Sequence, residues 1–383
     1  MIESHDRQSP ESTNGRPLHL LALMLKAPGI APNQRYRHEQ WAPYLRQDHN
    51  IHLECEAFES AALTAVLYER GHAVLKARLI LADALRRWKR RNRALMFDGV
   101  VVLRQAMLIG GAWLENWLVR RRVPLFYDFD DPVWMWNRSV ANGLFNLASA
   151  PWKVGRICRI ATAVTVGNDY LATYARRYNT NVHIVRTSID ADRFPRYPDP
   201  TTDRPFTVVW TGSHSTLPHL DTIRGTLERF AAKRPLCLRV ICDVPPTPFH
   251  NVRLEFIPWR PETEAMELSP GHVGVMPLPD SPAARGKCGC KALQYMAIGR
   301  PAIVSPVGIN REIIQDGVNG LWATTPDEWE AQFERLADDA ELRTRLGDAG
   351  RRTVLSGFTA RQSAAAFARV VRGKLGWTNG APN

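Results

Sequence analysis

The chain has 383 residues and a formal net charge of +12; 45% of its residues are hydrophobic and 23% are charged. This composition excludes a disordered or fibrous chain and predicts a globular protein with two domains of ordinary size. The excess of positive charge favours anionic partners such as nucleotide sugars, acidic lipid surfaces or nucleic acid. The six cysteines lack disulfide-framework spacing, so we expect free thiols in a reducing compartment.

No apolar run approaches the length of a membrane span, and the N-terminal residues are polar, unlike a signal peptide. We therefore expect a cytoplasmic protein. Residues 1–16 are rich in small and polar residues, which predicts a disordered tail.

An N-terminal domain is predicted over residues 17–190, where buried strands alternate with helices. Strands are expected at 17–25, 97–104, 124–128, 162–167 and 182–186. The first strand leads through a glycine-containing loop into a helix, which is how nucleotide-binding α/β domains begin. Arg35 and Arg37 stand at the start of that helix. They are either placed to contact a phosphate or are ordinary solvated arginines.

The segment 73–97 is predicted to be helical and is strongly basic. Its cationic residues are Lys76, Arg78, Arg86, Arg87, Lys89, Arg90, Arg91 and Arg93. Ala77, Leu81, Ala84, Leu85 and Trp88 recur at helical spacing on one side. The helix either docks on the protein by this apolar stripe or lies on an anionic membrane. Nucleic-acid binding is disfavoured, because no stacking pattern or groove-reading module accompanies the charges.

A linker rich in Pro and Asp is predicted at 191–205, and a second strand–helix series occupies 206–357. Its first strand ends in a turn that contains Gly212 and Ser213 and precedes a helix. Gly212 allows close approach of the backbone, and Ser213 is able to donate to a diphosphate. A plain turn and helix cap would explain the same residues. Residues 358–383 form a last helix and tail.

The most specific stretch is KCGCKALQYMAIGRP at 287–301, followed by AIVSPVG and, from Glu312, EIIQDGVNG. It predicts a basic loop, a short helix, a buried strand and a second helix. Lys287, Gly289 and Lys291 surround the N-terminus of the first helix, where backbone N–H groups and positive charge suit a phosphate. Gln294, one turn into that helix, could reach a sugar hydroxyl. Two exposed lysines are the alternative interpretation.

This stretch resembles the C-terminal domain of retaining GT-B glycosyltransferases of the family-4 type, also called glycosyl transferases group 1. Their pattern resembles GFxKLLEYMAxGxPVVxS followed by G…EIIxDGxNG, so the similarity spans about fifty residues. A family glutamate that contacts the donor ribose falls on Gln294, and an earlier glutamate falls near Gly286 or Lys287. An amide still donates and accepts hydrogen bonds, so ribose binding survives, whereas a role that needs charge does not.

The resemblance implies a GT-B fold of two facing Rossmann-like domains with a cleft between them, and a last helix that crosses back to the first domain. It also implies donor binding by Gly212, Ser213, Lys287, Gly289, Lys291, Gln294 and Glu312. For Glu312, a helix cap or surface salt bridge explains the residue almost as well. The lysines would stabilise the negative charge that develops on the leaving diphosphate.

Asp128 ends the strand 124–128, and Asp130 and Asp131 follow it. Open α/β sheets carry active sites at the carboxyl ends of their strands. We expect them on the acceptor side of the cleft, where one orients or deprotonates the acceptor hydroxyl. A helix cap or hydrogen-bonded loop is the alternative. An Asp-x-Asp pair can bind a divalent cation in another glycosyltransferase fold, and Cys288 and Cys290 resemble half of a zinc site. We expect no metal at either place.

The sequence therefore predicts transfer of a sugar from a nucleoside diphosphate sugar to a hydroxyl acceptor, with retention of the anomeric configuration. The reaction is expected to need neither a metal ion nor a further cofactor. The acceptor is expected in cell-surface polysaccharide or glycolipid synthesis. A lipid-linked acceptor at the inner face of the membrane is one form of this expectation. A sugar-nucleotide epimerase or hydrolase on the same fold, or a catalytically degenerate sugar-nucleotide-binding protein, are the alternatives.

Overall fold

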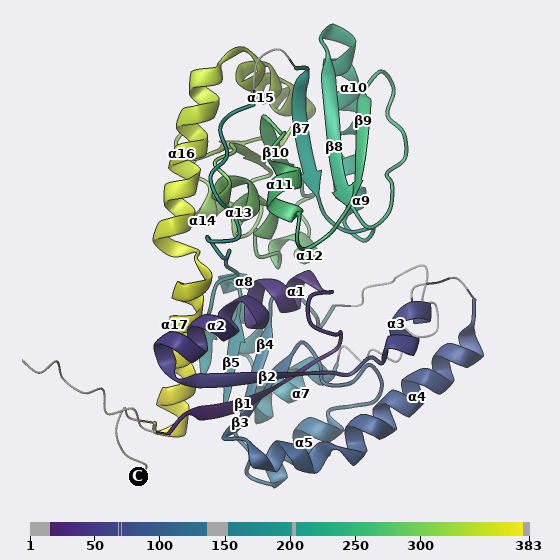
Figure 1. Ribbon diagram of the computed structural model, residues 1–383, viewed down its shortest axis with the longest axis vertical. Coiled ribbons are helices and arrows are strands. Elements are labelled where there is room, and N and C mark those ends of the chain that lie inside the picture. The colour runs from purple at the N-terminus through teal and green to yellow at the C-terminus, as the bar shows by residue number, and fades with distance from the viewer. Residues whose placement is uncertain (1–15, 68, 70, 136–151, 201–203, 378–383) are drawn as a thin grey trace, which may run out of the picture.

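The computed structural model describes residues 16–67, 69, 71–135, 152–200 and 204–377. Two α/β domains lie one above the other, with the N-terminal domain at the bottom in Figure 1. Apart from Arg16, the tail predicted at 1–16 lies outside the described residues.

The N-terminal sheet is parallel, with the strand order β2-β1-β3-β4-β5-β6. Its strands are β1 (Leu18–Met24), β2 (Ile51–Ala57), β3 (Gly99–Leu103), β4 (Leu125–Phe129), β5 (Ala163–Val166) and β6 (Val182–Ile184). Strand β2 was not predicted. It is an edge strand in which Ile51 alone is buried, so it lacks the apolar run that marks the central strands.

The helices of this domain cover both faces of the sheet. They are α1 (Pro32–Gln34), the π-helix η1 (Arg35–Glu39), α2 (Gln40–His49), α3 (Ala61–Leu67), α4 (Ala73–Lys89), the 3-10 helix η2 (Arg91–Met96), α5 (Trp113–Arg120), α7 (Lys153–Ile160) and α8 (Asp169–Ala175). The π-helix is notable because such turns are rare and occur frequently at functional sites.

The C-terminal sheet is also parallel, with the order β12-β11-β10-β7-β8-β9. Its strands are β7 (Phe206–Thr211), β8 (Leu236–Cys242), β9 (Arg253–Pro258), β10 (Val273–Met276), β11 (Ala302–Val304) and β12 (Leu321–Trp322). Its helices are α9 (Leu217–Asp221), α10 (Arg224–Lys233), α11 (Glu264–Leu268), α12 (Pro282–Arg285), α13 (Cys290–Ala297), α14 (Asn310–Ile313) and α15 (Pro326–Asp338). Strands β7, β8 and β9 point toward the N-terminal domain (Figure 1).

Helices α16 (Ala340–Gly357) and α17 (Ala360–Leu375) run down one side of both domains (Figure 1). A capping box formed by Thr359 and Gln362 starts α17. The buried face of α17 lies in the core of the N-terminal domain, where the ring of Phe367 packs 5.7 Å from that of Trp41. The chain that completes the upper domain therefore also completes the core of the lower one.

Helix α4 differs from its predicted orientation. Its buried residues are Lys76, Ile80, Asp83 and Arg87. Of the expected docking residues, Ala84 and Trp88 pack against the core of the N-terminal domain, whereas Leu81 and Leu85 are 55% and 51% exposed. Burial of these charges is tolerated because each has a partner from another segment, which offsets the cost of removing it from water. Asp83, for example, accepts from the Ser60 backbone (2.8 Å) and hydroxyl (2.9 Å).

None of the helices in the described part of the chain is long and apolar enough to cross a membrane.

Candidate functional site

The loop before α13 is pressed against the N-terminal domain. Asn168, the N-cap of α8, donates from its side chain to the carbonyl oxygens of Gly286 (3.1 Å) and Lys287 (2.9 Å). A Cβ at position 286 would lie 2.6 Å from the ring of Pro132. Glycine at this position therefore lets the loop reach the segment that follows β4.

A chain of charged side chains crosses the same contact between domains. Lys287 Nζ lies 2.9 Å from the Asp131 carboxylate. Arg104 donates to Asp131 (2.5 Å) and to Asp130 (2.8 Å). Burial alone would raise the pKa of Asp131, but Lys287 and Arg104 outweigh burial and hold that pKa below its ordinary value. Asp131 is therefore ionised and a weak proton acceptor.

Asp128 lies in the core of the N-terminal domain and is fully buried. Arg37 donates two hydrogen bonds to its carboxylate, at 2.7 and 2.6 Å. The hydroxyl of Thr165 (2.5 Å) and Nε2 of His38 (3.0 Å) occupy the remaining sides. Burial raises the pKa of Asp128, and Arg37 followed by His38 more than reverses that effect. The expected contact between Asp128 and an acceptor does not fit this geometry, because no surface is left for a hydroxyl.

The same contacts bear on the alternative in which Asp128 and Asp130 bind a cation. In the structure each carboxylate faces an arginine, Arg37 for Asp128 and Arg104 for Asp130. Across the described residues, no group of three or more His, Cys, Asp or Glu side chains is placed to hold a metal ion. The guanidinium groups supply the positive charge that these carboxylates need.

A second buried network joins the domains around Glu264 on α11. One carboxylate oxygen of Glu264 accepts from Arg35 (2.8 Å) and Tyr36 (2.7 Å) of η1. The other oxygen accepts from Gln294 (2.7 Å) and from the Trp259 indole (3.0 Å). Gln294 also donates to the hydroxyl of Tyr36 at 2.7 Å. Each donor satisfies part of a carboxylate that would otherwise be costly to bury.

Several predicted ligand residues are thus used within the protein. Arg35 and Arg37 are 3% and 0% exposed, so neither guanidinium presents free surface to a phosphate. Gln294 is likewise buried, and its amide is committed to Tyr36 and Glu264. The sequence identified these positions, but their partners lie far away along the chain.

Lys291 is the cation that remains available, since no carboxylate among the described residues pairs with it. It lies in the first turn of α13, after Gly289, which is the N-cap and has a φ of +71°. Its Nζ is 5.4 Å from the centroid of the Trp210 ring. Burial and then the charge of Lys287 lower the pKa of Lys291 to about 8. Burial, followed by these two lysines, lowers the pKa of His219 to about 4. An anion bound here would relieve the crowding of positive charge.

Gly212 and Ser213 form the turn that follows β7. A Cβ on Gly212 would lie 2.4 Å from the Trp210 ring, so a side chain does not fit. The Ser213 backbone N–H donates to the hydroxyl of Thr216 (3.1 Å), and its own hydroxyl lies 2.9 Å from that of Ser215. These contacts correspond to the turn that the sequence left open as an alternative, whereas the N-cap of α9, Thr216, forms no side-chain cap. The turn lies beside the Trp210 ring, over which Lys291 is placed.

Glu312 forms a further contact between the domains. Its carboxylate lies 3.0 Å from Nη2 of Arg186, and both side chains are partly exposed. This is the surface salt bridge that the sequence left open. Such pairs contribute up to about 1 kcal/mol to stability.

Sequence reasoning missed the residues that hold this interface together, namely Tyr36, Arg104, Asn168, Arg186 and Glu264. Asn168 carried a usable signal, because an Asn after a strand and before a helix is typical of an N-cap. Arg104 adopts a φ of +59°, which is unusual for arginine, but no sequence pattern announces it.

The C-terminal part of the chain matches a family model described as Glycosyl transferases group 1 over residues 281–353. The match includes the loop before α13 as well as Lys291, Gln294 and Glu312. No curated protein matches the chain in sequence.

Solved structures resemble most of the chain. Sucrose-phosphate synthase from Thermosynechococcus elongatus has a TM-score of 0.69 at 16% identity, covering 94% of this chain and 100% of that chain. Anabaena HepE in complex with UDP-glucose has a TM-score of 0.67 at 13% identity, covering 93% and 100%. A glycosyltransferase from Rickettsia africae has a TM-score of 0.62 at 11% identity, covering 94% and 99%. The fold is GT-B. The predicted fold class is confirmed.

We expect Glu264→Ala to lower the free energy of unfolding by about 3–5 kcal/mol, because Arg35 would remain as a buried charge without its partner. Denaturant unfolding measures this change. Glu262→Ala is the matched control, since Glu262 is exposed and forms no ion pair among the described residues. An equal loss in both variants would show that the Glu264 network does not hold the domains together.

Proposed function

We propose that the protein is a glycosyltransferase that moves a sugar from a nucleoside diphosphate sugar to a hydroxyl acceptor with retention of anomeric configuration. The observation that carries this proposal is Lys291. It is a cation without a carboxylate partner among the described residues, and it lies at the N-terminus of α13 within the segment that matches Glycosyl transferases group 1.

The donor diphosphate lies against the start of α13 in this proposal. Negative charge grows on its oxygens as the bond to the sugar breaks, and the Lys291 ammonium and the first N–H groups of α13 stabilise that charge. The turn at Gly212 and Ser213 forms the other wall. Lys287 leaves its ion pair with Asp131 and binds the phosphate when the donor is present. Gln294 and Glu312 face the N-terminal domain, so we leave both outside this donor site.

The acceptor lies beside Asp130 and Asp131, whose side chains are 12% and 24% exposed. Arg104 and Lys287 together neutralise the two carboxylates, so we assign Asp130 and Asp131 to orienting the acceptor and holding these two cations. In the retaining reaction that we propose, the leaving phosphate takes the proton of the acceptor hydroxyl. Retention rests on the resemblance to family-4 enzymes. The reaction then needs the nucleotide sugar as substrate and neither a metal ion nor a further cofactor.

A catalytically degenerate binding protein is the second candidate, because Gln294 and Gly286 stand where the family has glutamates. An epimerase or hydrolase on the same fold is a third. Product analysis separates them, since transfer yields a glycosylated acceptor, the other enzymes yield altered or free sugar, and a degenerate protein yields none of these. UDP-glucose is the first donor to test, because HepE was solved with it.

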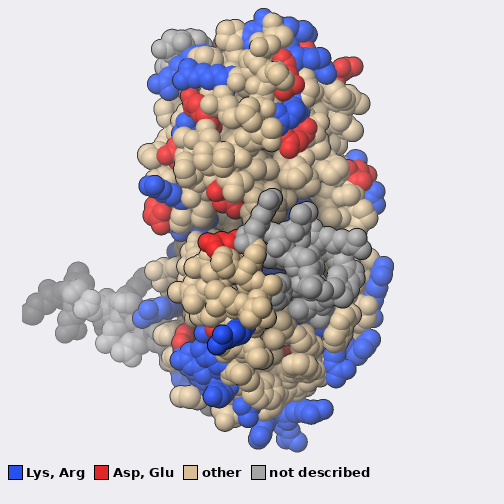
Figure 2. All heavy atoms as spheres, turned by 90° about the vertical axis from the view of Figure 1, so that its right-hand side faces the viewer, with Lys and Arg blue, Asp and Glu red and all other residues tan. Residues whose placement is uncertain are grey.

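We also propose that the protein works at the inner face of a membrane, on a lipid-linked acceptor in cell-surface polysaccharide or glycolipid synthesis. A row of exposed side chains on α4 supports this location. Val74, Arg78, Leu81, Leu85 and Lys89 follow one another at helical spacing and are all exposed. Figure 2 shows Lys and Arg gathered at the outer end of the N-terminal domain, with few acidic side chains among them. Apolar and cationic side chains in one row suit an anionic lipid surface.

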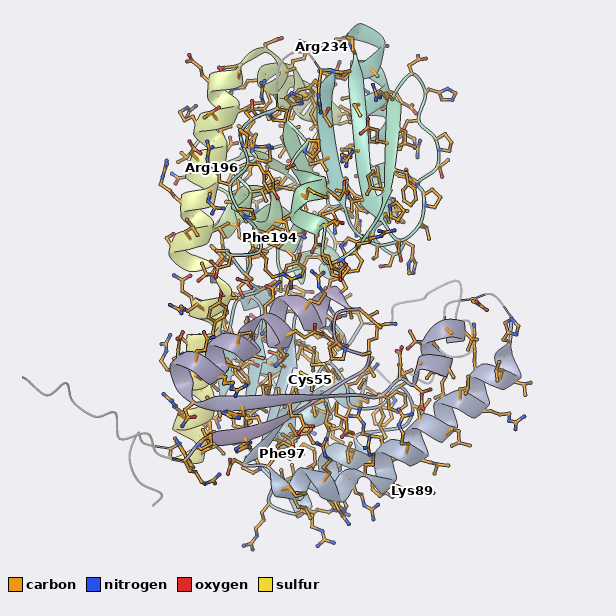
Figure 3. All side chains as sticks on the ribbon, in the orientation of Figure 1. Cys55, Lys89, Phe97, Phe194, Arg196 and Arg234 are labelled. Atoms are coloured by element: carbon orange, nitrogen blue, oxygen red, sulfur yellow. The ribbon has the colours of Figure 1, made fainter. Side chains whose placement is uncertain are left out.

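We expect UDP to raise the melting temperature, and Lys291→Gln to weaken UDP binding about tenfold or more because a charge-assisted contact is lost. Lys287→Ala should weaken binding less, since Lys287 starts in an ion pair. Calorimetric titration measures both. Lys89→Gln is the control, because Lys89 lies on α4 in the lower domain (Figure 3). Unchanged affinity in Lys291→Gln would remove that residue from the donor site.

Activity should persist in EDTA, because lysine and backbone N–H groups neutralise the diphosphate in the proposed site. The measurement is UDP release from UDP-glucose with and without chelator. Loss of activity in EDTA and recovery with Mn²⁺ would favour the cation alternative at Asp128 and Asp130 instead.

The protein should sediment with anionic vesicles at low salt and dissociate at high salt, because each cation near such a surface adds about 1 kcal/mol and salt screens it. Replacing Arg78, Lys89 and Arg90 by Gln should release the protein, and so should Leu81→Ser with Leu85→Ser. These residues are exposed and the cations have no ion pair among the described residues, so the fold is spared.

The matched control removes the same charge elsewhere by replacing Arg335, Arg352 and Arg369 with Gln, all of which are exposed. Equal binding to neutral vesicles, or equal release in the control, would show that α4 is an ordinary surface helix.

A further inference from the structure

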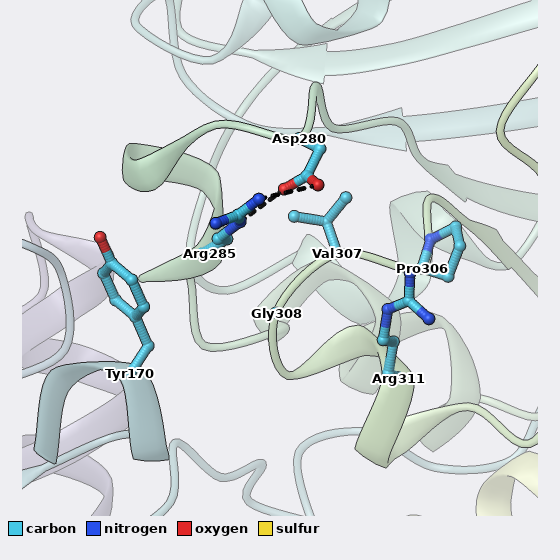
Figure 4. A pocket seen from close by; sticks show the side chains of 7 residues that line it. All are labelled: Tyr170, Asp280, Arg285, Pro306, Val307, Gly308 and Arg311. Carbon is cyan, nitrogen blue, oxygen red and sulfur yellow. Dashed lines mark hydrogen bonds and ion pairs between the residues drawn. The ribbon is translucent and has the colours of Figure 1, made fainter. Parts of the chain in front are cut away.

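A pocket of about 350 Å³ opens between the two domains, beside the loop that precedes α13. Its lining residues come from α8, from the segment 280–285 and from the loop 306–311. They include Tyr170, Asp280, Arg285, Gly308 and Arg311 (Figure 4). It shares no lining residue with the proposed donor site. Arg285 precedes Lys287 by two residues, so the pocket adjoins the lysine-bearing loop.

The charges of the pocket do not cancel. Arg285 donates to both oxygens of Asp280, at 2.7 and 3.0 Å. Arg311 also lines the pocket, is exposed, and has no ion pair or side-chain hydrogen bond within the described part of the chain. The hydrogen bonds from Arg285 lower the pKa of Asp280, which is therefore ionised and offsets one arginine. One positive charge is left over, on Arg311.

The walls are held in place by contacts on both sides. Gly308 has a φ of +56°, and a Cβ there would lie 2.6 Å from the carbonyl oxygen of Arg285, so the two loops are in close contact. On the other side, Asn168 precedes Tyr170 by two residues, and its side chain donates a hydrogen bond to the carbonyl oxygen of Gly286. Tyr170 also stacks on Trp134, with ring centroids 6.1 Å apart. The pocket is thus built when the domains are together.

We propose that this pocket binds a negatively charged group, a phosphate or carboxylate, on the sugar acceptor, with Arg311 as its ion-pair partner and Tyr170 as a hydroxyl donor. The proposal rests on the proposed function and names the class of its acceptor. Arginine suits such groups because its planar guanidinium binds two oxygens at once. Arg285, already paired with Asp280, supplies a fixed edge, and the phenol ring of Tyr170 supplies a flat face for a sugar.

The test uses the full chain saturated with UDP and titrates it with glucose 6-phosphate, glucose 1-phosphate, glucuronate, glucose and inorganic phosphate. At least one of the anionic sugars should bind, and glucose should bind more weakly than each anionic sugar that does. Arg311→Gln should weaken the binding about tenfold or more, as expected when a charge-assisted contact is lost. Tyr170→Phe should weaken it by a smaller factor.

Arg335→Gln is the matched control, since Arg335 is an exposed arginine of α15 in the same domain, and it should bind as the unaltered protein does. All variants should keep their affinity for UDP. UDP binding reports on the donor site. If the unaltered protein does not bind UDP, that result counts against the proposed function and not against the pocket.

Four results would overturn the proposal. They are no binding of any anion at millimolar concentration, equal binding in Arg311→Gln, competition with UDP, and binding of inorganic phosphate alone. Competition with UDP would show that the anion binds in the donor site and not in this pocket. Binding of phosphate alone would identify an anion site that takes no sugar.

Discussion

The arrangement of the two domains depends on a single helical turn, η1, whose consecutive side chains enter opposite domains. Arg35 and Tyr36 bind Glu264 of the C-terminal domain, while Arg37 and His38 bind Asp128 of the N-terminal domain. A buried charge is tolerated only when it is paired and hydrogen-bonded, so each carboxylate specifies the position of its arginine. Since the arginines are two residues apart on one turn, the two ion pairs together tie η1 to both domains.

This constraint determines which charges are left for chemistry. With the domains held together, Asp131 meets Lys287, and Arg104 takes up the rest of the acidic charge after β4. The proposed acceptor side is then nearly neutral, whereas Lys291 has no carboxylate partner among the described residues. A site that stabilises a leaving anion needs this imbalance, because a neutralised lysine would gain little when charge develops on the phosphate.

The fold could be predicted because its signals are local. Buried strands alternate with helices, and the 287–320 stretch carries a specific pattern. The site could be predicted only in part, since its residues pair with residues far away in the sequence. Arg35 and Glu264, for example, are 229 residues apart. The buried face of α4 was predicted only in part for the same reason. Periodicity correctly predicts a helix in which Ala84 and Trp88 pack against the core, but the burial of Asp83 involves Ser60 from another segment.

Gln294, which stands where the pattern that the sequence resembles has a glutamate, fits the same network. Glu264 already contributes the negative charge that Arg35 requires, and Gln294 approaches it at 2.7 Å as a hydrogen-bond donor. A glutamate at position 294 would bring a second carboxylate against the first, with no hydrogen to offer it or Tyr36 unless it were protonated. Gln294 is thus coupled to Glu264. The amide carries no charge at this position, but it donates hydrogen bonds to Tyr36 and Glu264 in the contact between the domains.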